Sequence, residues 1–138
     1  MVKLIMGGKG SGKTKILVDR VIEAIDKEDG DVVVIERGRE LTYNIPYRAR
    51  LIDASVYDIG SYEFLKGFLC GLHSGNYDIS YIFVENFFKI VSDKSDEALV
   101  SFISWLKSFS ENEHIDFVLS LSTDSDSAPE ALKDLIID

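Results

Sequence analysis

Apolar residues along this chain follow two patterns that alternate from one end to the other. Short apolar runs predict five strands, and apolar positions three or four residues apart predict helices between them. The expected strands are 2–6, 32–36, 50–56, 79–85 and 115–121. The expected helices are 13–28, 61–72 with Ser61 as its N-cap, one that begins at Ser95, and a short terminal helix opened by a capping box at 127–130.

Strands that alternate with helices are typical of βαβ units around a parallel sheet. The pattern therefore predicts an α/β protein with three layers and a mainly parallel sheet of five strands. The elements use nearly all of the 138 residues, without a repeat or a linker. We expect one minimal domain, residues 1–138.

Composition removes several classes of function. With 15 basic against 24 acidic residues the formal net charge is −9, which argues against general nucleic-acid binding, since that affinity comes mostly from neutralising phosphates. No apolar run approaches the ~20 residues of a membrane span, and no signal-peptide core is present. We expect a cytoplasmic protein that does not interact with membranes. One cysteine cannot form an internal disulfide, and with two histidines far apart in the sequence it argues against a zinc site.

One motif carries specific chemistry. Residues 7–14 follow the first predicted strand, precede the first predicted helix and form a complete G-x-x-x-x-G-K-T pattern. Glycines let successive backbone N–H groups point at phosphate oxygens, and the following helix presents its positive dipole end to the same anion. The pattern predicts that Lys13 reaches the β- and γ-phosphates and that the Thr14 hydroxyl coordinates Mg²⁺. The expected nucleotide-binding residues are Gly7, Gly8, Lys9, Gly10, Ser11, Gly12, Lys13 and Thr14.

This motif resembles the phosphate-binding loop of the P-loop NTPase superfamily. The resemblance implies a carboxylate at the end of a buried strand that holds the metal, and Glu85 after residues 81–84 fits that role. Glu85 would share the metal with Thr14; as a lone strand-end acid it would be solvated. In the large ATPase branch an acid often follows, whereas this chain has Asn86, which can orient water but cannot accept its proton. The catalytic residues implied are Lys13, Glu85 and Asn86, with slow hydrolysis unless another acid substitutes.

Further positions stay open between a role in chemistry and a plain structural role. Glu36, which ends the second predicted strand, is either a substitute acid or a surface charge. Ser122 or Thr123 is either a γ-phosphate sensor or loop-start polarity. The base-recognition motifs of GTPases are missing around 85–88 and 123–126, so ATP is the expected nucleotide.

The order of elements resembles the RecA-like layout, because strands 32–36 and 50–56 lie between the strand of the glycine motif and the strand before Glu85. The chain as a whole is similar to short bacterial P-loop proteins sometimes labelled twitching-motility ATPase-like. The resemblance implies nucleotide binding, with ATP and Mg²⁺ as cofactors, and little about biology.

The charge is uneven along the chain. Residues 37–50 contain four arginines and one acid, and residues 111–138 contain eight acids and one base. The segment 37–50 either contacts phosphates, an acceptor substrate or a neighbouring subunit, or is a solvated basic loop. Three functions remain: a slow or partner-dependent ATPase that acts as a switch, a small-molecule or nucleoside kinase that uses the Arg37–Arg50 segment, and a nucleotide-binding module that acts through a protein partner or self-association.

Overall fold

A single parallel sheet forms the centre of the computed structural model, which describes residues 1–27 and 29–137. Its six strands lie in the order β3-β2-β4-β5-β1-β6, and every neighbouring pair is parallel. The strands are β1 (Val2–Met6), β2 (Asp31–Glu36), β3 (Arg50–Asp53), β4 (Ile79–Val84), β5 (Asp116–Leu121) and β6 (Ile136–Ile137).

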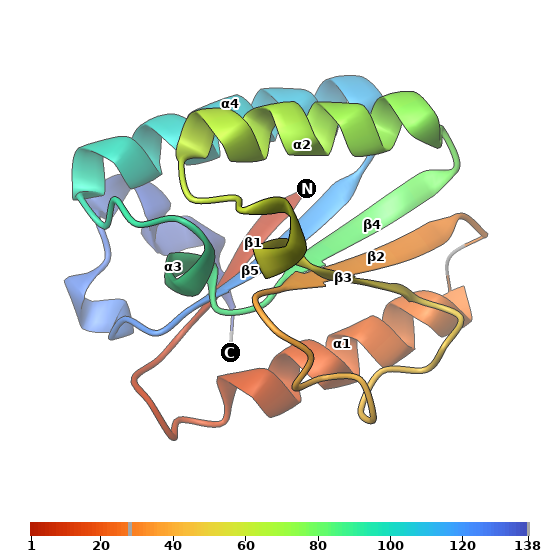
Figure 1. Ribbon diagram of the computed structural model, residues 1–138. Helices are drawn as coiled ribbons and strands as arrows, with labels where there is room; N and C mark the ends of the chain where they lie inside the picture. Colours follow the sequence, from red (N-terminus) through yellow and green to blue (C-terminus); the bar gives the residue numbers. More distant parts are fainter. Residues whose placement is uncertain (28, 138) are drawn as a thin grey trace.

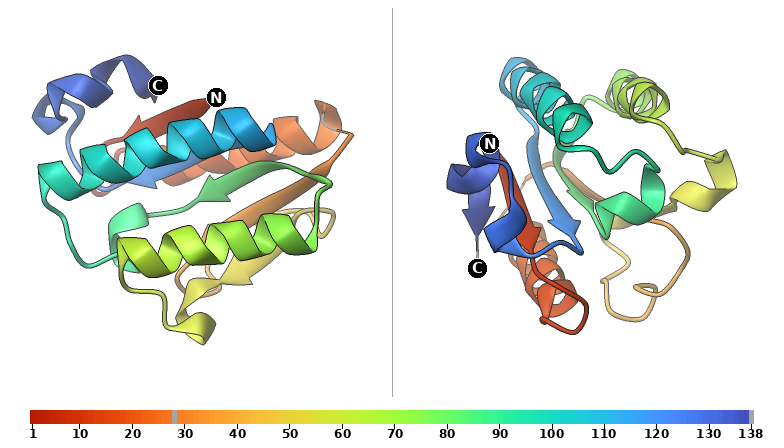
Figure 2. Two further views of the ribbon diagram at one scale, coloured as in Figure 1. Left: turned by 90° about the horizontal axis from the view of Figure 1, so that it is seen from above. Right: turned by 90° about the vertical axis from the view of Figure 1, so that its left-hand side faces the viewer.

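Helices cover both faces of this sheet and complete the three-layer α/β arrangement that the sequence pattern predicts (Figure 1). Helix α1 (Lys13–Lys27) lies on one face. Helices α2 (Tyr62–Gly75) and α4 (Asp96–Glu113) lie side by side on the other face with the single-turn helix α3 (Phe87–Ile90), as the view from above in Figure 2 shows.

Two hydrophobic cores follow from this layering. The larger core packs α2, α3 and α4 against one face of the sheet, with Phe87 and Phe102 among its fully buried side chains. The smaller core packs Leu17 and Val21 of α1 against the opposite face. The continuous β-branched run of β2 is buried on both faces, as expected for an inner parallel strand.

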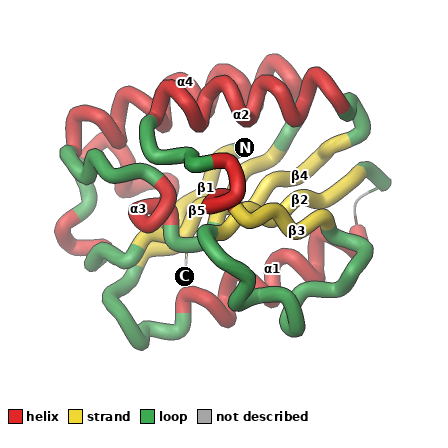
Figure 3. The backbone as a smooth tube through the Cα atoms, viewed as in Figure 1, coloured by secondary structure: helices red, strands yellow, loops and turns green. Residues whose placement is uncertain are grey.

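The connection from β2 to β3 contains no helix, and Figure 3 shows it as one long loop on the α1 side of the sheet. Its apolar residues Leu41, Ile45 and Ala49 are buried in the smaller core. The segment therefore covers the part of the sheet that α1 does not reach. The four arginines of the segment are exposed, as expected for a solvated basic loop, whereas these three apolar residues anchor the segment to the core.

The predicted helix starts at Ser61 and Ser95 are confirmed. The Ser61 hydroxyl accepts from the amide of Phe64 at 3.1 Å, and the Ser95 hydroxyl accepts from the amide of Ala98 at 3.3 Å. The first helix is confirmed from Lys13 to Lys27, and the predicted last residue, position 28, lies outside the described residues.

The predicted count of five strands is wrong, because the sheet has six. The sixth, β6, follows a stretch expected to be a capped α-helix. Instead the chain forms two 3-10 helices, Ser125–Ser127 and Glu130–Leu135. The capping box fails because Glu130 pairs with Lys133 while the Ser127 amide donates to Asp124, and Pro129 occupies the N-cap position. The predicted strand 50–56 ends at Asp53, where a 3-10 helix, Ala54–Tyr57, begins.

Across the described residues, no helix combines the length and the apolar character that crossing a membrane requires.

Candidate functional site

The loop of residues 7–12, which we call the glycine loop, connects the end of β1 to the start of α1. Gly10 and Gly12 have φ values of 82° and 86°, which residues other than glycine rarely adopt. A Cβ atom on Gly7 would lie 2.3 Å from the Ser11 hydroxyl oxygen. Glycine is therefore required at these three positions for two different reasons, backbone conformation and close approach.

Most backbone amides of the glycine loop are left without an internal acceptor. The Gly7 amide donates to the carbonyl of Leu121 at 3.3 Å and the Ser11 amide to the carbonyl of Gly8 at 3.1 Å. In residues 1–27 and 29–137 no group accepts from the amides of Gly8, Lys9, Gly10, Gly12 or Lys13. These N–H groups and the first turn of α1 form a cluster of donors that suits an anion.

Lys13 and Thr14 form the first turn of α1, directly after this loop. Lys13 is only 7% exposed, an uncommon state for a lysine without a paired charge. The Thr14 hydroxyl donates to Glu85 Oε1 at 3.1 Å. Two residues 71 positions apart, both expected at one metal site, are therefore in direct contact.

Glu85 follows the last residue of β4 and is 8% exposed. Its amide donates to the carbonyl of Ile35 on β2 at 2.8 Å, which fixes its backbone beside the neighbouring strand. Its second carboxylate oxygen, Oε2, accepts from the Ser120 hydroxyl at 3.2 Å. Both oxygens of the Glu85 carboxylate thus meet a hydroxyl group, one from α1 and one from β5.

Ser120 is a site residue that sequence reasoning missed. It lies on β5 and is fully buried. Its hydroxyl accepts from the backbone N–H of Asn86 at 2.7 Å and donates to the Glu85 carboxylate. The signal was available, because Ser120 is the one polar residue among the apolar positions of 117–121. A buried hydroxyl in such a run requires a hydrogen-bond partner.

Asn86 adopts the left-handed conformation, with φ 53°. Its side-chain Oδ1 accepts from the Ser122 hydroxyl at 3.1 Å. This bond uses the amide oxygen and leaves the NH₂ group as the free end of the side chain. Of the two alternatives for a polar residue after β5, Ser122 joins the cluster; Thr123 makes no side-chain hydrogen bond to any described residue.

Glu36 ends β2, next to the strand that precedes Glu85. The interpretation of Glu36 as a surface charge is wrong, because it is 3% exposed. Burial raises the pKa of the Glu36 carboxyl above its ordinary 4.5, and the negative charges of Glu40 and Glu85 add to this increase. The Leu41 amide, which donates to Glu36 Oε2 at 2.9 Å, acts in the opposite direction and lowers the pKa.

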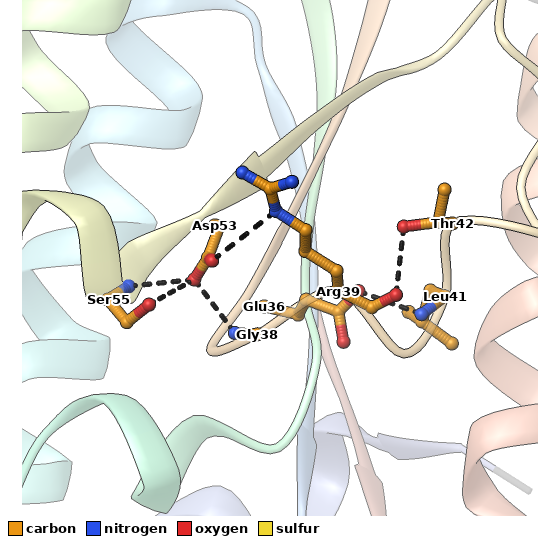
Figure 4. A network of polar contacts seen from close by, with 7 residues as sticks. All are labelled: Glu36, Gly38, Arg39, Leu41, Thr42, Asp53 and Ser55. Atoms are coloured by element: carbon orange, nitrogen blue, oxygen red, sulfur yellow. Dashed lines mark hydrogen bonds and ion pairs between the residues drawn. The ribbon is translucent and has the colours of Figure 1, made fainter.

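A second carboxylate organises the loop after β2, as Figure 4 shows. Asp53 Oδ1, at the end of β3, accepts from the Gly38 amide at 2.8 Å, from the Ser55 amide at 3.0 Å and from the Ser55 hydroxyl at 2.7 Å. The Ser55 hydroxyl lowers the pKa of Asp53 most, and the two amides add to the effect. Arg39 Nε lies 3.9 Å from Asp53 Oδ2.

The arginines of residues 37–50, the arginine segment, do not converge on one point. Arg37 donates to the carbonyl of Lys89 at 3.2 Å, and Arg48 donates to the carbonyl of Ile25 at 2.9 Å. These carbonyls belong to α3 and α1, on opposite faces of the sheet. The Arg50 side chain makes no hydrogen bond or ion pair to any described residue.

The donor set at the site consists of hard oxygen atoms. The Thr14 hydroxyl and the Glu85 carboxylate are in contact, and among the described residues no three His, Cys, Asp or Glu side chains form a cluster that could hold a metal by themselves. Mg²⁺ is commonly held by one or two protein oxygens, with phosphate oxygens and water as its other ligands. The arrangement fits that mode of binding.

No protein-family model matches this chain, and a search of curated proteins returned no significant match, so the site is interpreted from its own geometry.

Proposed function

We propose that this protein binds a nucleoside triphosphate, with ATP as the expected nucleotide, at the glycine loop together with Mg²⁺, and hydrolyses it slowly or only with a partner. The observation that carries the proposal is the hydrogen bond between Thr14 and Glu85 at 3.1 Å. The P-loop pattern gives Thr14 a metal role, and the resemblance that this pattern carries assigns Glu85 to the same metal. Their contact supports both assignments.

The glycine loop supports the binding of a phosphate chain. Its unpaired amides, the N-terminus of α1 and the buried Lys13 ammonium combine three attractions for a phosphate chain. Thr14 and Glu85 would hold Mg²⁺, which neutralises charge on the phosphates when bound. Ser120 keeps the Glu85 carboxylate oriented.

The strand order also supports the RecA-like branch of the P-loop superfamily. Strand β5 lies between β1, which leads into the glycine loop, and β4, which leads into Glu85. In that branch a polar residue at the end of the strand beside the P-loop strand senses the γ-phosphate. Ser122, which is bonded to Asn86, occupies the corresponding position here.

Slow hydrolysis follows from the chemistry of position 86. The Asn86 side chain offers an NH₂ donor, which can orient water but cannot take its proton. We infer that Glu36 is the proton acceptor for any unaided turnover, because it is the buried carboxylate next to Glu85 and its raised pKa brings it closer to the working pH. One of its oxygens is already engaged by Leu41, which limits its reach.

The kinase alternative needs the arginine segment to gather around an acceptor. Arg37 and Arg48 are instead held by backbone carbonyls on different faces of the sheet. Nothing in the described residues favours the kinase over the ATPase, and the kinase stays a prediction.

The first test is thermal unfolding with ATP, GTP and ADP, each with Mg²⁺ and with a chelator. The proposal expects a rise in melting temperature with ATP that is larger when Mg²⁺ is present. ADP release should then be slower than the ~10 s⁻¹ typical of enzymes. No stabilisation by any nucleotide would overturn the proposal.

The second test concerns position 86. Asn86→Glu should raise the single-turnover rate on saturated protein, since a positioned base is typically worth ~10²–10⁴-fold. Asn86→Gln is the matched control, with the same length and no carboxylate. Fast wild-type hydrolysis that Asn86→Ala leaves unchanged would show that Asn86 does not limit the rate, and Glu36→Gln would then be the informative variant.

A further inference from the structure

The sheet has two free edges, at β3 and at β6. Within residues 1–27 and 29–137, strand β3 pairs only with β2, and strand β6 pairs only with β1. The strand order puts these two strands at opposite ends of the sheet. A free edge presents unpaired backbone N–H and C=O groups, which proteins usually cover, interrupt or pair with another strand.

The β3 edge is hollowed on both of its sides. A groove of about 1030 Å³ lies between β3 and α2, and a second hollow of about 480 Å³ lies between β3 and the start of the arginine segment. Arg50, Leu51, Ile52 and Tyr57 line both hollows. We call the two hollows together the edge groove; neither contains a residue of the glycine loop.

Large apolar side chains are exposed around the edge groove. Tyr47 is fully exposed, and Val56, Tyr57 and Phe64 are about half exposed or more. Protein interfaces are enriched in aromatic residues and arginine, and contiguous exposed apolar side chains mark interaction surfaces. This composition fits a protein partner at the β3 edge.

The two edges carry opposite charge. Residues 37–50 next to β3 have four arginines and one acid, a net charge of +3, and residues 124–137 around β6 have four acids and one lysine, a net charge of −3. The acids that line the edge groove have internal partners: Asp53 bonds to Ser55, Glu63 to Lys66 and Asp31 to Asn76. Arg50 is therefore the unpaired charge at one edge, and exposed Asp134 has no partner among described residues at the other.

We infer that the β6 edge of a second copy of this chain docks in the edge groove and continues the parallel sheet from one molecule to the next. All strands run in one direction, so β6 of one copy can lie parallel to β3 of another. Ile136 and Ile137, both partly exposed, would then meet Leu51 and the exposed aromatic side chains. A symmetric pairing of β3 with β3 is disfavoured because it brings the arginines of two copies together.

This contact joins two different surfaces, so it can repeat and produce closed rings or open chains. The association needs no nucleotide and is independent of the proposed function. The molar mass measured by light scattering should rise above that of the monomer with concentration, and less so at 0.5 M salt, where surface charges are screened. A monomer at every concentration would overturn the inference.

A charge exchange identifies the two edges. Arg50→Glu alone and Asp134→Lys alone should each weaken association about tenfold, since attraction becomes repulsion. An equimolar mixture of the two variants should recover the wild-type mass, because the reversed edges complement each other. Lys107→Glu, at an exposed residue of α4, is the control and should change nothing.

Three results contradict this mode of assembly: association that neither variant affects, loss in both variants without recovery on mixing, and loss in Arg50→Glu alone. Thermal unfolding of each variant, expected to match the wild type, excludes misfolding as the cause. Binding of a single-stranded oligonucleotide by a strictly monomeric protein, lost in Arg50→Glu, would assign the edge groove to nucleic acid and overturn the inference.

Discussion

Two loops leave the same edge of the sheet and treat their backbone amides in opposite ways. In the loop after β2, residues 37–42, the Gly38 and Leu41 amides donate to Asp53 and Glu36, carboxylates of the chain itself. In the glycine loop after β1, most amides have no acceptor in the described part of the chain. The amides of residues 37–42 bind carboxylates of the chain itself, whereas most amides of the glycine loop stay available for an external anion.

The difference separates stability from binding. Carboxylates that accept from a loop's amides fix that loop in the free protein, so removing the acceptor altogether, as Asp53→Ala does, should lower the free energy of unfolding. A loop with unpaired amides contributes little to folding and gains its bonds from a ligand. The four predictions below test this separation, starting with the largest effect.

Lys13→Ala should remove most of the stabilisation by MgATP while the free protein melts almost unchanged. Ligand at 100 times its dissociation constant should stabilise the wild type by ~2.7 kcal/mol. Thermal unfolding with and without ligand measures this effect. Lys15→Ala, at an exposed lysine of the same helix that pairs with Asp19, is the control and should keep the stabilisation. An equal shift in Lys13→Ala would refute the assignment of the loop.

Asp53→Ala should show the reverse behaviour. It removes the acceptor of two amides and a hydroxyl at a side chain that is 17% exposed, and it should cost about 2 kcal/mol of unfolding free energy. Denaturant unfolding measures the loss, and Asp134→Ala is a control at an exposed aspartate. The added stability from MgATP should be the same as in the wild type. A loss of nucleotide binding instead would mean that the two loops are not separate.

Glu85→Gln should weaken the part of nucleotide binding that depends on Mg²⁺, by about 1.5 kcal/mol, because a charged acceptor becomes neutral. Titrations with and without a chelator separate this part from metal-free binding, which should change less. Glu63→Gln, at an exposed acid of α2, serves as the control. Equal effects with and without metal would leave Glu85 as a structural residue only.

Glu36→Gln should give the smallest effect, one that depends on pH. The folded state holds the Glu36 proton more tightly than the unfolded state, because the pKa is raised above 4.5. Above the raised pKa both states are ionised, and the folded state bears the cost of a buried charge. As pH falls through the raised pKa towards 4.5, that cost disappears.

The Glu36→Gln variant should therefore melt higher than the wild type at pH 7, by roughly 2–4 °C for each kcal/mol gained. The difference should shrink as the pH falls and vanish well below pH 4.5, where Glu36 is protonated in both states. Glu40→Gln, at the exposed neighbour, should show a much smaller difference. A difference that stays constant from pH 4 to pH 7 would show that the charge of Glu36 is not its cause.

The fold was largely predictable from the sequence because its elements are long and regular. The run Val32–Ile35 and the apolar stripe of α1 each have one physical solution, a buried strand and a buried helix face. Strand β6 was not predictable, since two isoleucines carry no periodicity and their pairing depends on β1, more than 130 residues earlier. The 3-10 helix after Asp53 has a local cap, the Asp53–Ser55 bond, and only the bond of Asp53 to Gly38 depends on the tertiary fold.

The candidate site divides along the same line. The sequence motif of residues 7–14 predicts the glycine loop, and the contact of Thr14 with Glu85 agrees with the metal site expected from the resemblance. The contacts of Ser120 and the burial of Glu36 depend on which strands are neighbours, and no local sequence pattern predicts the strand order. A search for polar residues inside apolar strands would have found Ser120.

The left-handed backbone at Asn86 restricts the side chains that this position accepts without strain. With φ at 53°, position 86 suits asparagine, aspartate and glycine, whereas other side chains cost roughly 1–2 kcal/mol. Of the two acids, aspartate is therefore the one that this backbone accepts readily, so Asn86→Asp adds a carboxylate with less backbone strain than Asn86→Glu.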